Sequence, residues 1–466
     1  MNVFSATAPA ENSTSKGNGP IKPPTEDQIS ALCFLDSGYT GISLTSAKRL
    51  EIDFDCRGHI LNDNCMCTSE QMDDFVQNIS EFLQHVKQIA PNIREMSIKW
   101  ETIYTKTANS PDDSTFVNLI LKLADGIKDI QLYGFVNSAS VSHNIPSVFT
   151  GLTNFFYVSK NCSLGVDIIL LNSTTLQKLI VIDMADAHVE RLFYNDMDEP
   201  IIYPCLTKLT LICNDFLFAR PVKKRSCHFP RLESIKLDGS YPKLSSSFFN
   251  DNSTLKYLGF RIRHELMRRI NKDRLFDSCN LRQLDHLYVD YSFTRSQLNS
   301  SYSRYINNSE AAEYLELLFK STDCLRSLTL YFFRYEKKII DVMAGTRAFA
   351  NIQKLDFQMH NITFNDIVLV LGNVPRVCVF RCCPVKDQPS IDGDKDEILL
   401  QYIESRKYPL SKYLSRIYVH YGPALYVDST CQALALLVAG CPRLSIVESS
   451  ANYRPQFVAG FKKLTE

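Results

Sequence analysis

One spacing of apolar residues recurs along this chain: three of them at positions i, i+3 and i+5, which we call the anchor phrase. Leu206, Leu209 and Leu211 form one copy, and Leu325, Leu328 and Leu330 form another. The copies begin at Ala47, Ile93, Ile127, Leu152, Leu176, Leu206, Leu232, Leu255, Leu284, Leu325, Ile352, Val374, Leu414 and Leu444. Successive starts lie about 22 to 46 residues apart, and a period of this size is typical of repeat proteins.

Several anchor phrases follow a segment whose apolar residues recur at the period of a helix. The clearest is 70–90, where one apolar stripe is formed by Met72, Phe75, Val76, Ile79, Phe82, Leu83, Val86 and Ile89. The same order of helix, turn and strand is predicted at 116–132, 311–330, 366–380 and 431–447. Such a unit cannot bury both its strand and its helix alone, but stacked copies make a continuous core. We therefore predict an α/β solenoid, a curved horseshoe with parallel strands on the concave face and helices on the convex face.

The anchor phrase resembles the leucine-rich repeat, whose pattern is L-x-x-L-x-L-x-x-N/C-x-L. The segment 206–214 matches it through Asn214, and the segment 374–382 matches it with Cys382. Elsewhere the ninth position departs from Asn or Cys, so the resemblance implies irregular repeats with variable turns. The segments around Cys324 and Cys441 resemble the long repeats of F-box-type leucine-rich-repeat proteins and their fungal relatives.

The chain is expected to have two parts. Residues 1–28 are rich in Ser, Thr, Asn, Gly and Pro and are predicted to be a disordered tail. Residues 29–466 are predicted to form the leucine-rich-repeat solenoid, with roughly 13–14 irregular repeats. The last segment, 450–466, is expected to be its C-terminal cap.

Composition argues against several classes of protein. Lys+Arg and Asp+Glu are both 51, so no overall field favours nucleic acid or an anionic membrane. No apolar run approaches the roughly 20 residues of a membrane-spanning helix. The 15 Cys are scattered and odd in number, which favours reduced thiols. We expect a cytoplasmic protein, with the nucleus as the alternative.

No motif for catalysis, cofactor or metal binding is visible. The glycine-rich phosphate loops and the nucleophile elbow are missing, and the chain has only 17 Gly from which to build such loops. His264 and Glu265 begin like a zinc-protease motif, but Arg268 stands where the second His would be. The basic stretch 261–274 is interpreted as a solvated helix or loop, and contact with an acidic partner or RNA phosphates is the alternative. We therefore expect no enzyme activity, no cofactor and no metal.

The strand positions between the anchors are predicted to point away from the helices, since strand side chains alternate. Counting from each anchor start, they place on the concave face Tyr257, Arg261, His286, Tyr288, Asp290, Tyr331, Gln358, Phe380, Arg416, Tyr418 and His420. Tyr, Arg and His exposed in a row are typical of protein interfaces. The alternative is that these aromatic residues reflect strand propensity and cross-strand packing.

The function expected from these observations is a non-catalytic scaffold that binds a protein partner with its concave face. One alternative is the substrate-recognition subunit of an F-box-type ubiquitin ligase. No F-box is visible, and only residues 1–45 have room for a module that docks the ligase adaptor. A lesser alternative is a GTPase-activating leucine-rich-repeat protein, although the end of the chain, 460–466, lacks the acidic tail of that family.

Overall fold

The strands of this computed structural model lie where the anchor phrases predict strands. The structure describes residues 29–30, 48–54, 91–100, 126–133, 149–158, 163–184, 186–195, 197, 199–212, 229–238, 254–261, 281–290, 308–334, 337–360, 364–382, 411–419 and 440–449. The chain divides into two compact units, which we describe separately. Unit 1 comprises Met1–Asn214 with His228–Arg231, and unit 2 comprises Asp215–Cys227 with Leu232–Glu466.

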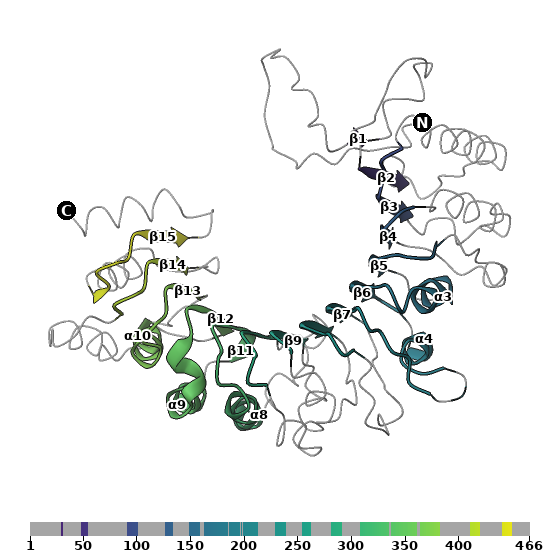
Figure 1. The fold of residues 1–466 in the computed structure, drawn as a ribbon. Helices are drawn as coiled ribbons and strands as arrows, with labels where there is room; N and C mark the ends of the chain where they lie inside the picture. The colour runs from purple at the N-terminus through teal and green to yellow at the C-terminus, as the bar shows by residue number, and fades with distance from the viewer. Residues whose placement is uncertain are drawn as a thin grey trace, which may run out of the picture. The chain divides into compact units, whose positions relative to one another are not determined.

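In unit 1, each described strand pairs in parallel with the strands that precede and follow it in the chain. These strands are β1 (Ile29–Ser30), β2 (Arg49–Phe54), β3 (Glu95–Trp100), β4 (Asp129–Tyr133), β5 (Asn154–Val158), β6 (Lys178–Ile182) and β7 (Lys208–Ile212). Figure 1 shows them in this order, with α3 (Ser163–Leu171) and α4 (Asp186–Arg191) on one face of the sheet.

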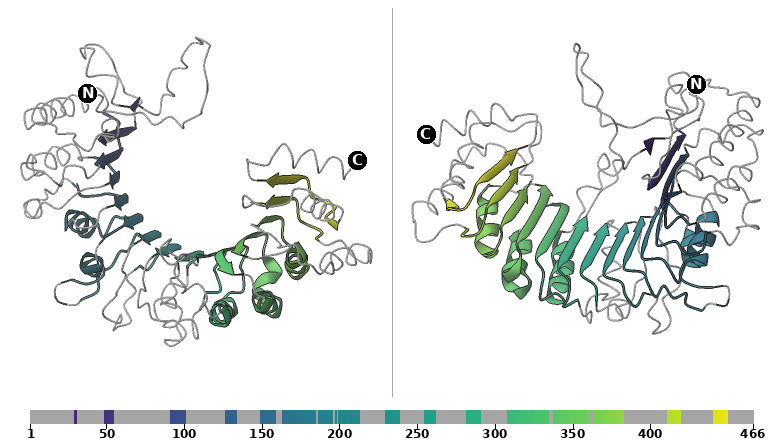
Figure 2. Two further views of the ribbon diagram at one scale, coloured as in Figure 1. Left: turned by 180° about the vertical axis from the view of Figure 1, so that it is seen from behind. Right: turned by 45° about the horizontal axis from the view of Figure 1, so that its top comes forward.

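Unit 2 repeats the arrangement, again with parallel pairing in chain order. Its strands are β8 (Ser234–Asp238), β9 (Tyr257–Arg261), β10 (His286–Asp290), β11 (Ser327–Arg334), β12 (Lys354–His360), β13 (Val379–Cys382), β14 (Arg416–Val419) and β15 (Ile446–Ser449). On one face lie α8 (Asn308–Lys320), α9 (Lys337–Gly345), the 3-10 helix η7 (Arg347–Asn351) and α10 (Phe364–Asn373) (Figures 1 and 2). The predicted α/β class with an open parallel sheet is therefore confirmed.

Two of the predicted helices are observed, α8 (308–320) at the start of 311–330 and α10 (364–373) at the start of 366–380, each beginning two or three residues before the predicted segment. The helical segment 70–90 and the helical parts 116–125 and 431–439 lie outside the described residues, as do the predicted tail 1–28 and the predicted cap 450–466.

The core of each unit lies between its sheet and its helices. In β6, Leu179 and Val181 are buried, whereas Lys178, Ile180 and Ile182 on the other face are not. On the helix side of unit 2, α8 buries one stripe, formed by Ala312, Leu315, Leu318 and Phe319. The Phe319 ring packs edge-on against the Phe349 ring of η7, with ring centroids 4.6 Å apart. Each helix therefore covers the anchor residues and leaves the opposite face of the strands open.

A doubled hydrogen bond recurs where the strands begin. The carbonyl oxygen of the residue after the first anchor accepts from two successive amides of the next repeat. Gln177 O, for example, accepts from Thr207 N at 2.8 Å and from Lys208 N at 3.0 Å. The carbonyls that do the same belong to Lys48, Arg94, Lys128, Thr153, Glu233, Lys256, Asp285, Arg326, Gln353 and Cys378. This contact fixes each strand in register with its neighbour before the sheet proper begins.

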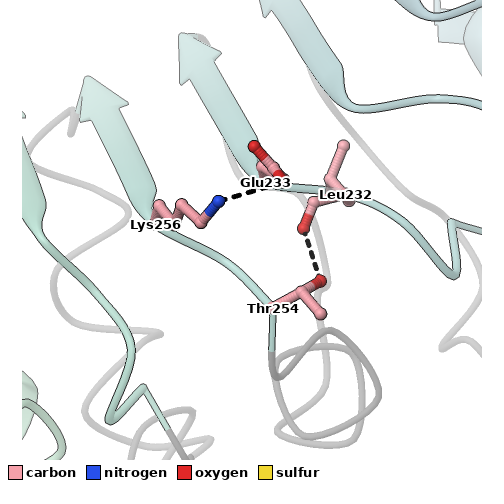
Figure 3. Close-up of polar contacts among 4 residues, drawn as sticks. All are labelled: Leu232, Glu233, Thr254 and Lys256. Atoms are coloured by element: carbon pink, nitrogen blue, oxygen red, sulfur yellow. Dashed lines mark hydrogen bonds and ion pairs between the residues drawn. The ribbon is translucent and has the colours of Figure 1, made fainter.

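Side chains add to this backbone contact. The hydroxyl of Thr207 donates to Gln177 O at 3.0 Å, and that of Ser415 donates to Cys378 O at 3.1 Å. Figure 3 shows the entry to β8 and β9, where Thr254 Oγ1 donates to Leu232 O and Lys256 Nζ pairs with the Glu233 carboxylate, each at 3.0 Å. Both contacts join residues of successive repeats.

The predicted register is wrong at β13. Phe380 pairs with Leu355 of β12 and Ile417 of β14, which are both anchors. Val377, Phe380 and Cys382 are fully buried, so the anchor phrase begins at Val377 rather than Val374. Cys382 is thus a strand anchor and not the ninth position of a leucine-rich repeat. The cause is that two overlapping triplets share the same spacing, and Val374, in the turn after α10, is itself buried.

Candidate protein-binding face

The strands of unit 2 align their open-face residues in rows. The pairing register places in one middle row Lys236, Gly259, Tyr288, Thr329, Asp356, Arg381 and Tyr418. An entry row, two residues earlier in each strand, contains Ser234, Tyr257, His286, Ser327, Lys354, Val379 and Arg416. We call these two rows, together with Tyr331 of β11, which follows the middle row and pairs with Asp290, the unit 2 open face.

Most predicted partner-contacting residues that can be placed lie on this surface. His286 and Arg416 are exposed, and the partly buried ones are Tyr257, Tyr288, Tyr331 and Tyr418. Arg261 and Gln358 occupy strand positions after the middle row, but only their backbone is described. His420 lies outside the described residues.

Two predicted residues are placed differently. Asp290 lies at the exit of β10 but is only 2% exposed, and its carboxylate accepts a hydrogen bond from Tyr288 Oη at 3.2 Å. Phe380 was predicted to be exposed to a partner, and this is wrong because the register of β13 turns its ring into the core. Asp290 therefore fixes the Tyr288 hydroxyl through this hydrogen bond, and Phe380 contributes to the packing of the core.

Aromatic rings of neighbouring strands lie close together on the open face. The ring centroids of Tyr257 and His286 are 6.4 Å apart, and those of Tyr288 and Tyr331 are 6.5 Å apart with the ring planes inclined by 29°. Burial raises the pKa of the Tyr257 phenol above its usual range. The group offers a partner flat apolar surface with hydroxyl donors at its edges, a combination that suits interfaces.

Lys236 reaches this aromatic group from two strands away. Its ammonium lies 5.1 Å from the centre of the Tyr288 ring, within the range of a cation–π contact. The residue between them in the middle row is Gly259. A Cβ atom at this glycine would lie 3.3 Å from Lys236 Cγ and 3.1 Å from Tyr257 Cε1, closer than ordinary contact. Because glycine has no side chain, the side chain of Lys236 has room to extend past Gly259 to the Tyr288 ring.

A second charged group lies further along the middle row. Arg381 Nη1 is 3.3 Å from Asp356 Oδ2, whose side chain is 9% exposed, and its guanidinium lies 5.1 Å from the centre of the Tyr418 ring. Arg381 and Lys236 were both missed at the sequence level. Arg381 is recovered once the anchor phrase is started at Val377, because it then falls at the middle open-face position of β13.

After their first residues, β5 and β6 carry only apolar side chains on the open face of unit 1, and β7 adds Ile212 next to Thr210, which was not predicted. These apolar side chains are partly buried, and we call them the unit 1 apolar strip: Phe156, Val158, Ile180, Ile182 and Ile212. The Tyr133 ring of β4 lies 4.7 Å from the Phe156 ring. The sequence did carry a signal, since the segments 155–158 and 179–182 are unbroken apolar runs rather than alternating ones.

Three further observations concern the described part of the chain outside the open faces. There, no group of three or more His, Cys, Asp or Glu side chains lies close enough to hold a metal ion. No described helix has the length and apolar character that crossing a membrane requires. His188 of α4 has a lowered pKa because of its burial and the neighbouring Arg191, with Asp167 opposing the shift. This histidine lies on the helix side and not on the open face.

Comparisons with known proteins assign no family. No family model and no curated protein matches the chain. One solved structure, a protein from Bacteroides fragilis determined as a structural-genomics target, matches 83% of this chain and 73% of its own at 10% identity, with a TM-score of 0.23. A TM-score this low assigns neither fold nor function.

Proposed function

We propose that this chain is a non-catalytic scaffold that binds a protein partner through the unit 2 open face. The observation that carries the proposal is the arrangement of Tyr288, Tyr331, Arg381 and Tyr418, large amphipathic side chains on the face that the described helices do not cover. Tyr and Arg are enriched at the points of strongest binding in protein interfaces. Their contacts with one another restrict their rotamers before a partner arrives, which lowers the entropic cost of binding.

The class we propose is a leucine-rich-repeat-like solenoid with this face on its concave side. Strand after strand carries the L-x-x-L-x-L spacing, and the pairing in chain order is the arrangement that such repeats adopt. The ninth-position residues add little support, because Cys382 is a strand anchor.

A more specific role, substrate recognition for an F-box-type ubiquitin ligase, depends on residues 1–45. Only β1 of that segment is described. Co-purification of a ligase adaptor with the full chain, and its loss when 1–45 is deleted, is the result this role requires. We propose the cytoplasm as the location, with the nucleus as the alternative.

The scaffold proposal is tested by affinity purification with quantitative mass spectrometry, using the full chain and a triple variant, Tyr288→Ala, Tyr331→Ala and Tyr418→Ala. The control is Tyr413→Ala, since this tyrosine is 45% exposed but precedes β14 and lies outside the rows of the open face. We expect one or more partners to fall at least about tenfold in the triple variant and to stay at the wild-type level in the control.

Circular dichroism of all three proteins checks that the fold is kept. Partners retained equally by the triple variant would place binding elsewhere on the molecule and overturn the proposal.

A further inference from the structure

Two strands of unit 1 are apolar on both faces. In β5 and β6 the helix-side residues Phe155, Tyr157, Leu179 and Val181 are buried beneath the helices, and the residues between them are apolar as well. Parallel strands with such unbroken apolar runs are normally covered on both faces. The equivalent rows of unit 2 contain lysine, aspartate, arginine and tyrosine instead. The apolar character of the unit 1 strip is therefore not a requirement of the repeat.

Basic residues border the strip along the entry side of the strands. Lys178 and Lys208 are neighbours in register at the first positions of β6 and β7, and both are exposed. Neither ammonium forms an ion pair or hydrogen bond with a described residue. On the preceding pair of strands the situation differs, because Asp129 is already bonded by the side chains of Thr153 and Asn154. The charges beside the strip that have no described partner are therefore the positive ones of Lys178 and Lys208.

We propose that the unit 1 apolar strip binds an acidic amphipathic helix of a partner protein. The apolar stripe of that helix lies on Phe156, Ile180 and Ile182, and carboxylates beside the stripe lie over Lys178 and Lys208. Charge complementarity selects an acidic partner over a basic one. This surface is separate from the unit 2 open face, and the proposal does not depend on the function assigned to that face.

The spacing of the strip suits a helix laid across the strands. Neighbouring strands are about 4.8 Å apart, and a helix advances about 5.4 Å per turn. Apolar residues three and four positions apart therefore contact successive strands, as in other complexes that place a helix on an apolar surface. The row from Val158 to Ile182 to Ile212 extends this contact over three strands.

The test uses a displayed library of 18-residue helical peptides with a fixed Leu and Ile stripe, whose flanking positions vary among Glu, Gln and Lys. The library is selected on the full-length protein, and the enriched peptides are measured by fluorescence anisotropy. We expect Glu to be enriched on one flank of the stripe. We expect Lys178→Glu with Lys208→Glu to raise the Kd at least about tenfold and to shift the preference towards Lys-flanked peptides.

The matched control is Lys338→Glu with Lys412→Glu, the same charge change on exposed lysines of unit 2 that lie outside the rows of the open face, and it should leave the Kd unchanged. Ile180→Ser with Ile182→Ser should also weaken binding, with circular dichroism confirming the fold. Because the lysine variants alter only exposed side chains, they test the proposal even if the serine variant unfolds.

Three results would overturn the proposal that the strip binds an acidic helix. They are that no peptide is enriched, that enrichment does not depend on the charge of the flanking positions, or that Lys178→Glu with Lys208→Glu binds the peptides as tightly as the wild type. Two other occupants of the strip would be recognised by different measurements. A dimer in sedimentation velocity that Lys178→Glu with Lys208→Glu dissociates would assign the strip to a second copy. Carbodiimide cross-links from Lys178 to Glu26 within one chain would assign it to the chain's own N-terminal segment.

Discussion

The ammonium of Lys236 lies 5.1 Å from the centre of the Tyr288 ring, although strand β9 runs between them. The contact exists because the intervening position of the middle row is Gly259. Tyr288 is held in turn by its hydrogen bond to the buried Asp290 and by its contact with the Tyr331 ring. A glycine in a strand, which is usually unfavourable, here allows residues two strands apart to interact.

Coupling between Lys236 and Tyr288 should be measurable in a double-mutant cycle. Lys236→Met and Tyr288→Leu, alone and together, are expected to give a coupling of about 0.5–1 kcal/mol in the free energy of unfolding, as for other exposed cation–π pairs. In a Gly259→Val background the coupling should fall close to zero, because the new side chain occupies the path of the lysine. The cycle of Lys354→Met with Tyr288→Leu, which has no such contact, is the control. Equal coupling in both cycles would contradict this account.

Two helical glycines should respond in opposite directions to alanine. A Cβ atom at Gly165 of α3 would lie 2.6 Å from the ring of Tyr157, which is completely buried and cannot move aside. At Gly372 of α10 a Cβ atom meets nothing within 4 Å. We expect Gly165→Ala to lower the free energy of unfolding by about 1–3 kcal/mol, as overpacking does. Gly372→Ala should raise it by up to about 1 kcal/mol through helix propensity. Urea unfolding followed by circular dichroism measures both, and stabilisation by Gly165→Ala would show that α3 does not approach β5 so closely.

The register of β13 can be tested with adjacent residues. Phe380 is fully buried, whereas Val379 is only partly buried on the open face. Phe380→Ala is expected to cost about 3–5 kcal/mol in the free energy of unfolding. Val379→Ala should cost less than about 1 kcal/mol. The register predicted from an anchor phrase starting at Val374 requires the reverse order, so the ranking of these two variants decides between the registers.

The cysteines of the repeats should differ in reactivity. Burial raises the pKa of the Cys441 thiol to about 11, opposed by a hydrogen bond from Ser411, and this residue is 1% exposed. Cys324, in contrast, is exposed. Since the thiolate is the reactive form, iodoacetamide at pH 8 should modify Cys441 at least about 100-fold more slowly than Cys324 in the native protein. Peptide mapping by mass spectrometry follows each residue, and the difference should vanish in urea. Similar native rates would show that Cys441 is not buried.

The sequence was sufficient to predict the class of fold and most strand positions. Apolar spacing reports burial directly, so the anchors of β6, β7 and β11 could be located from Leu179, Leu209 and Leu328 alone. Apolar spacing gave the wrong register at β13 because a buried turn residue, Val374, has the same spacing as a strand anchor. Only the strand pairing distinguishes the two triplets.

The candidate site was predicted less completely than the fold. Alternation places Tyr288, Tyr331 and Tyr418 on the open face, but it says nothing of contacts between strands. Asp290 is buried although its position in the strand is an open-face one, which alternation alone does not predict. The strip around Ile180 was not predicted because the sequence criterion for a binding face was the presence of polar and aromatic residues. Aliphatic residues on a strand ordinarily belong to a core, so they did not meet that criterion.

The doubled hydrogen bond that recurs at the strand entries has an evolutionary consequence. It needs a carbonyl and two consecutive amides, groups that nearly every residue type supplies, so it imposes almost no demand on side-chain identity. An intragenic duplication or deletion of one whole repeat would regenerate the same contact with the new neighbour. Chain length and surface chemistry are then free to diverge between descendants while the backbone connection persists, and the chemistry of the two open faces in this chain differs in just this way.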